Sequence, residues 1–130
     1  MTNYTMGDFM IRIKNAYMAH RLTVETPYSK ASLALAKILS ENKYVKKVEE
    51  KEENGRKQLV VTLLYTKRAP GMQTVKIIST PSLHIYVKRH ELPKKVRELG
   101  MHIVSTSKGI MSDEQAMKEG VGGKLLFQVQ

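Results

Sequence analysis

The chain has 130 residues, and 22 lysine and arginine side chains against 12 aspartate and glutamate side chains give it a net charge of +10. This length allows one well-packed domain or two very small ones. The charge indicates a polyanionic partner such as nucleic acid or an anionic membrane. Cysteine is absent, which excludes a disulfide scaffold, a cysteine-based zinc site and a thiol nucleophile.

No apolar run approaches the roughly 20 residues that span a bilayer. The first ten residues contain an early acidic residue, Asp8, and lack the charged and apolar regions of a signal peptide. We therefore expect a cytoplasmic protein without a membrane partner.

The first third of the sequence predicts two helices. Thr5 and Asp8 have the spacing of a capping box, and apolar residues recur behind them at helical intervals as far as Tyr17. This stripe is expected to pack in the core. After an extended segment over residues 22–26, Ser29 is a good N-cap for a second helix, because its hydroxyl can accept a hydrogen bond from a free amide of the first turn.

Alternation of apolar and polar residues then predicts a β-hairpin. Its strands cover residues 44–53 and 57–65, and Asn54-Gly55 between them is typical of a tight hairpin turn. Charges of both signs along this hairpin indicate a solvated arm. A polar break over residues 67–73 follows and is the expected linker.

The rest of the chain is richer in strands, with short helices between them. Pro93 opens a short helix through Leu99, and Ser112 caps another that ends at Gly120. The expected strands cover residues 74–79, 83–88, 101–106 and 124–129. In the last of these, Leu125, Phe127 and Val129 are expected to point inward.

This pattern predicts an α+β fold made of two small α/β subdomains. Residues 1–66 form the N-terminal subdomain, residues 67–73 the linker, and residues 74–130 a C-terminal subdomain richer in strands. Each part is too small to be counted on to fold independently. We therefore expect the two to share an interface.

The basic residues are concentrated between residues 67 and 97, where eight cations stand with one acid, Glu91. Adjacent phosphates that are neutralised together release their counterions together, so clustered charge favours nucleic-acid binding over an incidental basic surface. The eight cations are Lys67, Arg68, Lys76, Lys88, Arg89, Lys94, Lys95 and Arg97.

One strand in this basic segment carries a tyrosine. Strand periodicity sends Ile85 and Val87 to one face and His84, Tyr86 and Lys88 to the other. An outward tyrosine between an imidazole and a cation could stack on an unpaired base. The alternative is a partly buried tyrosine whose hydroxyl has a backbone partner, and the sequence favours neither.

The run from Ser105 to Gly109 contains three consecutive hydroxyl side chains and then Lys108. Hydroxyls can address base edges, sugars or phosphates, the lysine adds a charge, and the glycine permits close backbone approach. The alternative is a polar turn at a strand end. The later Gly120-Val121-Gly122-Gly123 lacks the spacing of a phosphate-binding or dinucleotide-binding loop, so we interpret it as a tight bend at a strand start.

Patterns that would indicate catalysis are missing from the sequence. The four histidines lack metal-ligand spacing, no G-x-S-x-G nucleophile motif is present, and the acidic residues gather on the hairpin rather than as a carboxylate dyad. We expect no enzyme, no cofactor, no metal and no small-molecule substrate.

Several of these segments together resemble a known family. The run from Ser105 to Asp113, followed by the glycine-rich residues 120–123, closely resembles the C-terminal signature of the bacterial small-subunit ribosomal protein eight family. Residues 8–16 resemble the opening helix of that family, and residues 27–30 resemble its next landmark. The resemblance covers essentially the whole chain.

Membership would imply two α/β subdomains and a primary role in small-subunit assembly. Such proteins bind an irregular stem in the central domain of 16S rRNA, next to neighbouring small-subunit proteins, and several bacterial members repress their own operon by binding its mRNA. The resemblance places Ser105, Thr106, Ser107 and Lys108 at the distorted helix core with Tyr86 nearby. It also implies that Lys30, Arg12 and Asn15 meet the rRNA backbone.

The candidate RNA-binding residues, in chain order, are Arg12, Asn15, Lys30, Tyr86, Lys88, Ser105, Thr106, Ser107, Lys108, Gly109, Gly122 and Gly123. The alternative function is a basic DNA-binding or architectural protein that uses the same positive face. Competition by duplex DNA against a looped RNA would separate the two, because recognition of the 2′-hydroxyl distinguishes RNA from DNA.

Overall fold

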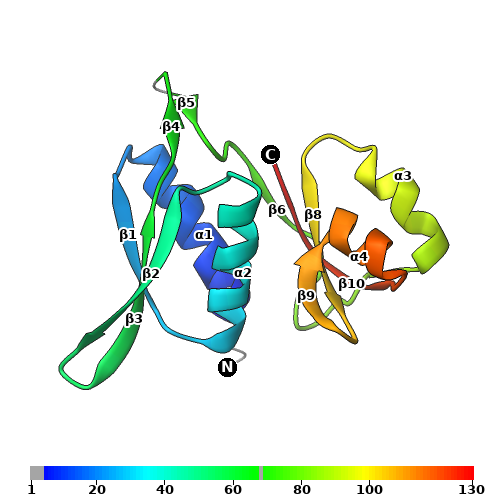
Figure 1. The fold of residues 1–130 in the computed structure, drawn as a ribbon, viewed down its shortest axis with the longest axis horizontal. Coiled ribbons are helices and arrows are strands. Elements are labelled where there is room, and N and C mark those ends of the chain that lie inside the picture. Colours follow the sequence, from blue (N-terminus) through cyan, green and yellow to red (C-terminus); the bar gives the residue numbers. More distant parts are fainter. Residues whose placement is uncertain (1–4, 68) are drawn as a thin grey trace. The chain divides into compact units, whose positions relative to one another are not determined.

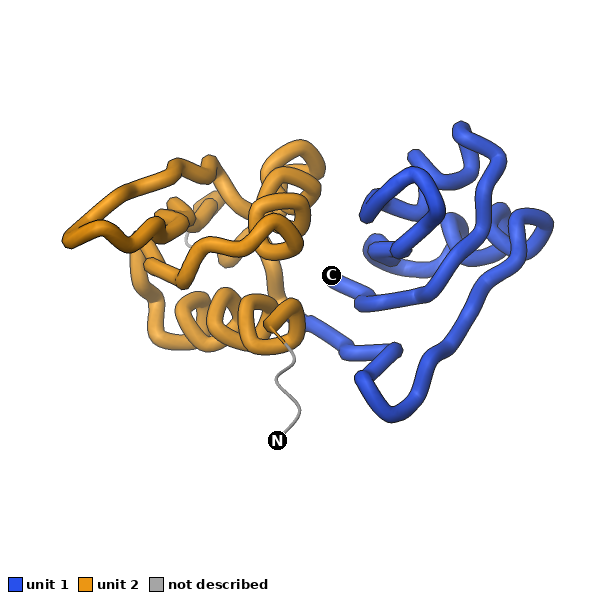
Figure 2. The backbone as a smooth tube through the Cα atoms, turned by 90° about the horizontal axis from the view of Figure 1, so that it is seen from below, with its two compact units in different colours: residues 1–4, 74–130 blue, residues 5–73 orange. Residues whose placement is uncertain are grey.

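The computed structural model describes residues 5–67 and 69–130, which belong to two compact units (Figures 1 and 2). The first unit contains residues 5–73, and residues 74–130 fall in the second. The fold is α+β and its C-terminal part is rich in strands, as the sequence predicts. Arg68, one of the eight clustered cations, lies outside the described residues.

The first unit packs two helices on one side of a three-stranded antiparallel sheet (Figure 1). The strands follow the order β1-β3-β2, so β3 is the central strand. The elements are α1 (Thr5–Met18), β1 (Thr23–Pro27), α2 (Lys30–Glu41), β2 (Lys47–Glu53) and β3 (Arg56–Thr62).

Both predicted helices are present, and α1 begins at Thr5 itself. The stripe of α1 is buried, and Phe9, Met10 and Ile13 are each at most 3% exposed. Ser29 caps α2, because its Oγ accepts a hydrogen bond from the Ser32 amide at 3.0 Å. This satisfies one of the amides that a helix leaves free at its start.

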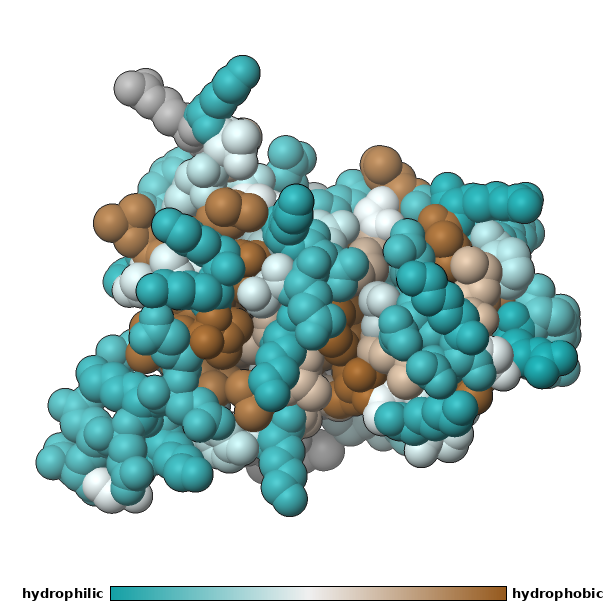
Figure 3. Space-filling model, in the orientation of Figure 1, coloured by the Kyte–Doolittle hydropathy of each residue, from teal (hydrophilic) through white to brown (hydrophobic). Residues whose placement is uncertain are grey.

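The hairpin turn at Asn54-Gly55 is confirmed. Asn54 has φ 52° and Gly55 has φ 77°, the pair of positive angles that joins two strands without splaying them. Hydrophilic side chains cover the hairpin at the lower left of Figure 3, as expected of a solvated arm. The first strand is shorter than expected, because it begins at Lys47 rather than at residue 44.

Tyr17 fastens α1 to the segment that follows β3. Its hydroxyl donates a hydrogen bond to the Tyr44 carbonyl and accepts one from the Leu64 amide at 3.1 Å. Burial raises the pKa of Tyr17, so the hydroxyl keeps the proton that it donates.

Residues of the expected linker pack in the first unit. The Gly71 amide donates a hydrogen bond to the Leu64 carbonyl at 2.8 Å, and Met72 is 2% exposed. Two short strands here pair with each other, β4 (Tyr65–Thr66) and β5 (Ala69–Pro70).

The second unit is built on a sheet whose strands follow the order β6-β10-β8-β9, with β7 also paired to β10. The helices α3 and α4 pack against each other and against β8 (Figure 1). Its elements are β6 (Val75–Ile77), β7 (Tyr86–Val87), the 3-10 turn η1 (Arg89–Glu91), α3 (Leu92–Val96), β8 (Met101–Thr106), β9 (Gly109–Ser112), α4 (Asp113–Glu119) and β10 (Gly123–Val129).

Three strands of this unit differ from the predictions. The sequence predicts a polar turn as far as Gly109 and no strand after it, whereas the structure has β9 there. β7 has two residues instead of six, and Ile85 is 38% exposed rather than inward. In β10, Leu125, Phe127 and Val129 are buried as expected, but a bulge between Leu125 and Phe127 interrupts the alternation and Leu126 is buried as well.

Candidate nucleic-acid interface

The register of three strands brings candidate residues from distant parts of the sequence to one end of the second sheet. Tyr86 of β7 lies opposite Lys124 of β10, and Lys124 lies opposite Ser105 of β8. Directly opposite residues point to the same face of a sheet. Tyr86, Lys124 and Ser105 therefore form one row, which we call the Tyr86 row.

The row lies on the sheet face opposite the core cluster of Val87, Val104 and Leu125; Tyr86 is exposed there, and Ser105 and Lys124 are half-buried. The neighbouring positions in the same strands are Val87, Gly123 and Thr106, and Val87 is 4% exposed. Because side chains alternate along a strand, the Tyr86 row lies on the opposite face.

Tyr86 is an exposed tyrosine. Its side chain is 67% exposed, and the ring of His84 meets it edge-on with 6.4 Å between ring centres. The interpretation as a partly buried tyrosine is wrong, and the ring face is accessible to a base. Lys88, two residues later, is also exposed. Its amide donates a hydrogen bond to Glu91 Oε1 at 2.9 Å, at the start of η1.

The hydroxyl run divides between a turn and the surface. Thr106 Oγ1 donates to the Gly109 carbonyl at 2.8 Å and accepts from the Lys108 amide at 3.1 Å, so this hydroxyl holds the turn together. Ser107 and Lys108 lie exposed at the tip. Gly109 has φ 115°, a backbone conformation that few other residues adopt. The polar turn is therefore present, and it displays the two side chains at its tip.

Gly122 and Gly123 let strands approach closely. A Cβ on Gly123 would lie 2.1 Å from the Ser105 carbonyl oxygen, and one on Gly122 would lie 2.4 Å from the Val87 carbonyl oxygen. Both contacts are with backbone atoms, so no side chain can move aside. This supports the interpretation of a tight bend at a strand start, and it explains the two glycines without an RNA contact.

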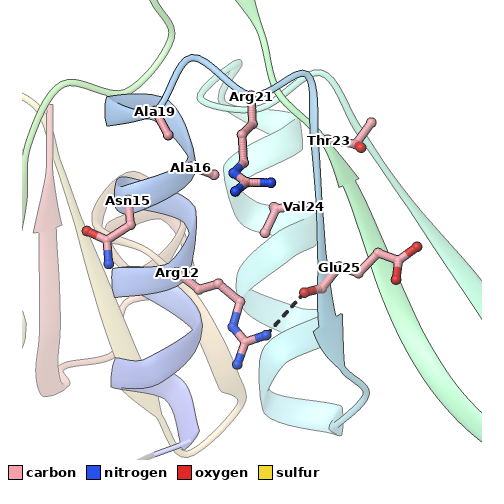
Figure 4. A pocket seen from close by; sticks show the side chains of 8 residues that line it. All are labelled: Arg12, Asn15, Ala16, Ala19, Arg21, Thr23, Val24 and Glu25. Atoms are coloured by element: carbon pink, nitrogen blue, oxygen red, sulfur yellow. Dashed lines mark hydrogen bonds between the residues drawn. The ribbon is translucent and has the colours of Figure 1, made fainter.

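The first unit contains a groove between α1 and β1 with a volume of about 620 Å³ (Figure 4). Arg12 and Arg21 point into it from opposite ends, and Arg12 Nη1 donates to the Glu25 carbonyl at 3.3 Å. Asn15, expected beside Arg12, also lines the groove. The Glu25 carboxylate is held by Lys51 at 3.2 Å. The lining residues are Arg12, Asn15, Ala16, Ala19, Arg21, Thr23, Val24 and Glu25.

Residues 4–130 match the model of the family described as Ribosomal protein S8. The chain belongs to the ribosomal protein S8 family. Similar proteins named small ribosomal subunit protein uS8 occur in Hydrogenovibrio crunogenus (40% identical, covering 95% of each chain), Nostoc punctiforme (37%, covering 98% of this chain and 97% of the relative) and Acinetobacter baylyi (39%, covering 94% and 93%). The resemblance noted in the sequence is thereby confirmed.

The S8 family is a family of ribosomal proteins rather than a class of enzymes. Within residues 5–67 and 69–130, no three histidine or acidic side chains are placed to hold a metal ion. None of the helices in the described part of the chain is long and apolar enough to cross a membrane.

Sequence reasoning missed two cations that the structure places with the candidates. Lys124 joins the Tyr86 row through strand pairing, and Arg21 joins the groove through the turn after α1. The alternation of the last strand was the signal available for Lys124. Lys30 is exposed as the first residue of α2 and does not line the groove.

Proposed function

We propose that this S8-family protein is a structural component of the small ribosomal subunit and binds rRNA through the Tyr86 row and the adjacent turn. The observation that carries the proposal is the register, which sets Tyr86, Lys124 and Ser105 side by side next to the tip residues Ser107 and Lys108. The net charge of +10 supports a polyanionic partner.

The mix of side chains on this face suits an irregular RNA better than a regular duplex. The deep, narrow major groove of A-form RNA hides its base edges, whereas a loop or bulge offers splayed bases. Tyr86 can stack on such a base, Ser107 can donate to and accept from its edge, and Lys108 and Lys124 can meet phosphates. The target we propose is an irregular stem in the central domain of 16S rRNA.

The groove of the first unit would add contacts that do not depend on sequence. Arg12 and Arg21 suit the forked geometry of a phosphate. Replacing Arg21 by methionine, which keeps an aliphatic stem of similar reach, should lower the slope of log affinity against log salt by about 0.7–0.9 for any RNA. A salt titration of filter binding measures this slope. An unchanged slope with both a looped and a regular RNA would remove the groove from the interface.

Repression of the protein's own operon is part of the same proposal. If one face recognises the irregular rRNA stem, an mRNA with a similar loop must occupy that face too. The two RNAs should then compete, and a titration of labelled mRNA leader with unlabelled rRNA stem would show it. Simultaneous binding of both RNAs would contradict a shared site.

Ser107→Ala tests the tip of the turn. We expect the specific complex to weaken by about 1–3 kcal/mol, because a hydroxyl that hydrogen-bonds in a desolvated site is lost. Thr106 holds the turn, so the fold should not change. Ser40→Ala, in α2 of the other unit, is the control. Equal affinity of Ser107→Ala and the unmodified protein for the stem would remove Ser107 from the contact.

The experiment for the whole proposal is a binding titration with the central-domain stem of 16S rRNA, an equal-length regular RNA duplex and a duplex DNA, each at two salt concentrations. Preference for the looped stem that survives the higher salt is the expected result. Equal, salt-sensitive binding to all three would favour the basic DNA-binding or architectural alternative.

A further inference from the structure

The ammonium group of Lys108 has a protein partner. Its Nζ lies 3.3 Å from Glu119 Oε2, and the other carboxylate oxygen of Glu119 accepts a hydrogen bond from Gln115 Nε2 at 3.1 Å. Gln115 and Glu119 are both on α4, one helical turn apart. Glu119 of α4 thus forms an ion pair with Lys108, which lies in the turn between β8 and β9.

The stability of α4 gives only a small reason for a carboxylate at this position, since a side-chain pair four residues apart, such as Gln115 and Glu119, contributes about 0.2–0.5 kcal/mol. Glu119 is the last residue of the helix, where the free carbonyl groups disfavour negative charge. The ion pair is also open to solvent, with side-chain exposures of 54% for Lys108 and 38% for Glu119, so it adds little to folding. A carboxylate beside a proposed RNA contact should in addition repel phosphate. Its presence there calls for a role in binding.

We propose that Glu119 is a positioning residue that fixes Lys108 and makes the turn selective for RNA of the right shape. The inference rests on the proposed function. A lysine ammonium has three N–H donors, and Glu119 engages one of them. The ion pair holds Nζ near one position beside α4, and the two remaining donors are left for a phosphate or base oxygen that a shaped RNA brings to that position.

An ordinary duplex gains less from the same lysine. Its phosphates have no fixed relation to the turn, so they can engage Lys108 fully only by drawing it away from Glu119. The carboxylate therefore lowers non-specific affinity while leaving the specific contact in place. Selectivity that comes from penalising the wrong partner is a general way to build a specific interface.

The test compares Glu119→Gln with Glu114→Gln. Both changes remove one negative charge from α4, but Glu114 is in its first turn and no described ion pair includes it. We expect Glu119→Gln to raise affinity for a regular RNA duplex about 3- to 10-fold at 0.1 M salt, since one more lysine releases counterions. Affinity for the looped stem should stay within about twofold, because the loss of Lys108 positioning offsets the gain from removing a carboxylate that repels phosphate. The specificity ratio therefore falls, while Glu114→Gln should change either affinity less than about twofold.

A third variant separates positioning from charge. In a Lys108→Met background, Glu119→Gln should no longer raise duplex affinity beyond the effect of Glu114→Gln. The inference is overturned if Glu119→Gln and Glu114→Gln act alike, or if the effect of Glu119→Gln survives without Lys108. Failure of the proposed function looks different, because the unmodified protein would then bind the looped stem no better than the duplex. Circular dichroism of each variant checks that α4 is intact.

Discussion

Gly123→Ala is expected to lower the free energy of unfolding of the second unit by about 3 kcal/mol or more. The new methyl group would lie 2.1 Å from the Ser105 carbonyl oxygen and 3.1 Å from Thr106 Cα. Both atoms belong to the backbone of β8, so relief requires β10 and β8 to separate where they are paired. That movement also pulls Lys124 away from Ser105 and takes the Tyr86 row apart. Urea denaturation followed by far-ultraviolet circular dichroism measures the loss.

Gly55→Ala is the matched control for this change. Gly55 has φ 77° and nothing within 4 Å of a Cβ, so alanine there meets strain in the backbone and no clash. The left-handed conformation costs about 1–2 kcal/mol. RNA affinity should not change, because the β2–β3 turn belongs neither to the Tyr86 row nor to the residues that line the groove of the first unit. If the two glycine variants lose the same stability, the close approach of β10 and β8 is not what requires glycine.

Asp113→Ala should destabilise the second unit by about 3–5 kcal/mol, since it leaves a buried polar network without its acceptor. Asp113 Oδ2 accepts from the His102 amide at 3.1 Å and lies 3.2 Å from His102 Nδ1. Its Oδ1 accepts from the Glu114 amide at 2.8 Å. Asp113 and His102 are each 2% exposed, so water cannot replace the carboxylate. Thermal and urea unfolding of the variant both measure the effect.

Two further variants show whether the network is the cause. Asp113→Asn keeps one oxygen that can accept from a backbone amide, so it should lose less stability than Asp113→Ala. Glu98→Gln changes the exposed partner, whose Oε2 lies 3.2 Å from His102 Nε2 with a side chain 39% exposed. An exposed partner of this kind contributes about 0–1 kcal/mol. If Glu98→Gln and Asp113→Ala lower the free energy of unfolding equally, the burial of Asp113 does not make its hydrogen bonds more important for stability.

The parts of the fold that the sequence predicts well are those fixed by neighbours in the chain. The Ser29 cap, the Asn54-Gly55 turn and the end of α4 at Gly120 each depend on three to five residues. Their physical chemistry is local, because a side chain satisfies a nearby amide or a glycine adopts a positive φ. The β8 strand was also predicted with the bounds that it has.

The parts that could not be predicted depend on pairing between distant segments. The bulge that buries Leu126 and the two-residue β7 are set by how β10 meets its partners. His102 looked like one of four scattered histidines, and only the fold sets it against Asp113. The same applies to the candidate site. The hydroxyl run was visible in the sequence. The places of Lys124 and Arg21 beside the candidate residues, and the ion pair of Glu119 with Lys108, depend on strand register and on packing between distant segments.

The central place of β10 has a consequence for the order of events during synthesis. β10 pairs with β6, β7 and β8, and all three precede it in the sequence. A ribosome releases these strands from its exit tunnel before residues 123–129 have emerged, and domains form during synthesis only when their parts are available. A nascent chain that stops short of β10 has no partner for β7 and no Lys124 beside Ser105. Such a chain cannot display the Tyr86 row, so an unfinished copy should not compete for the RNA that we propose this row binds.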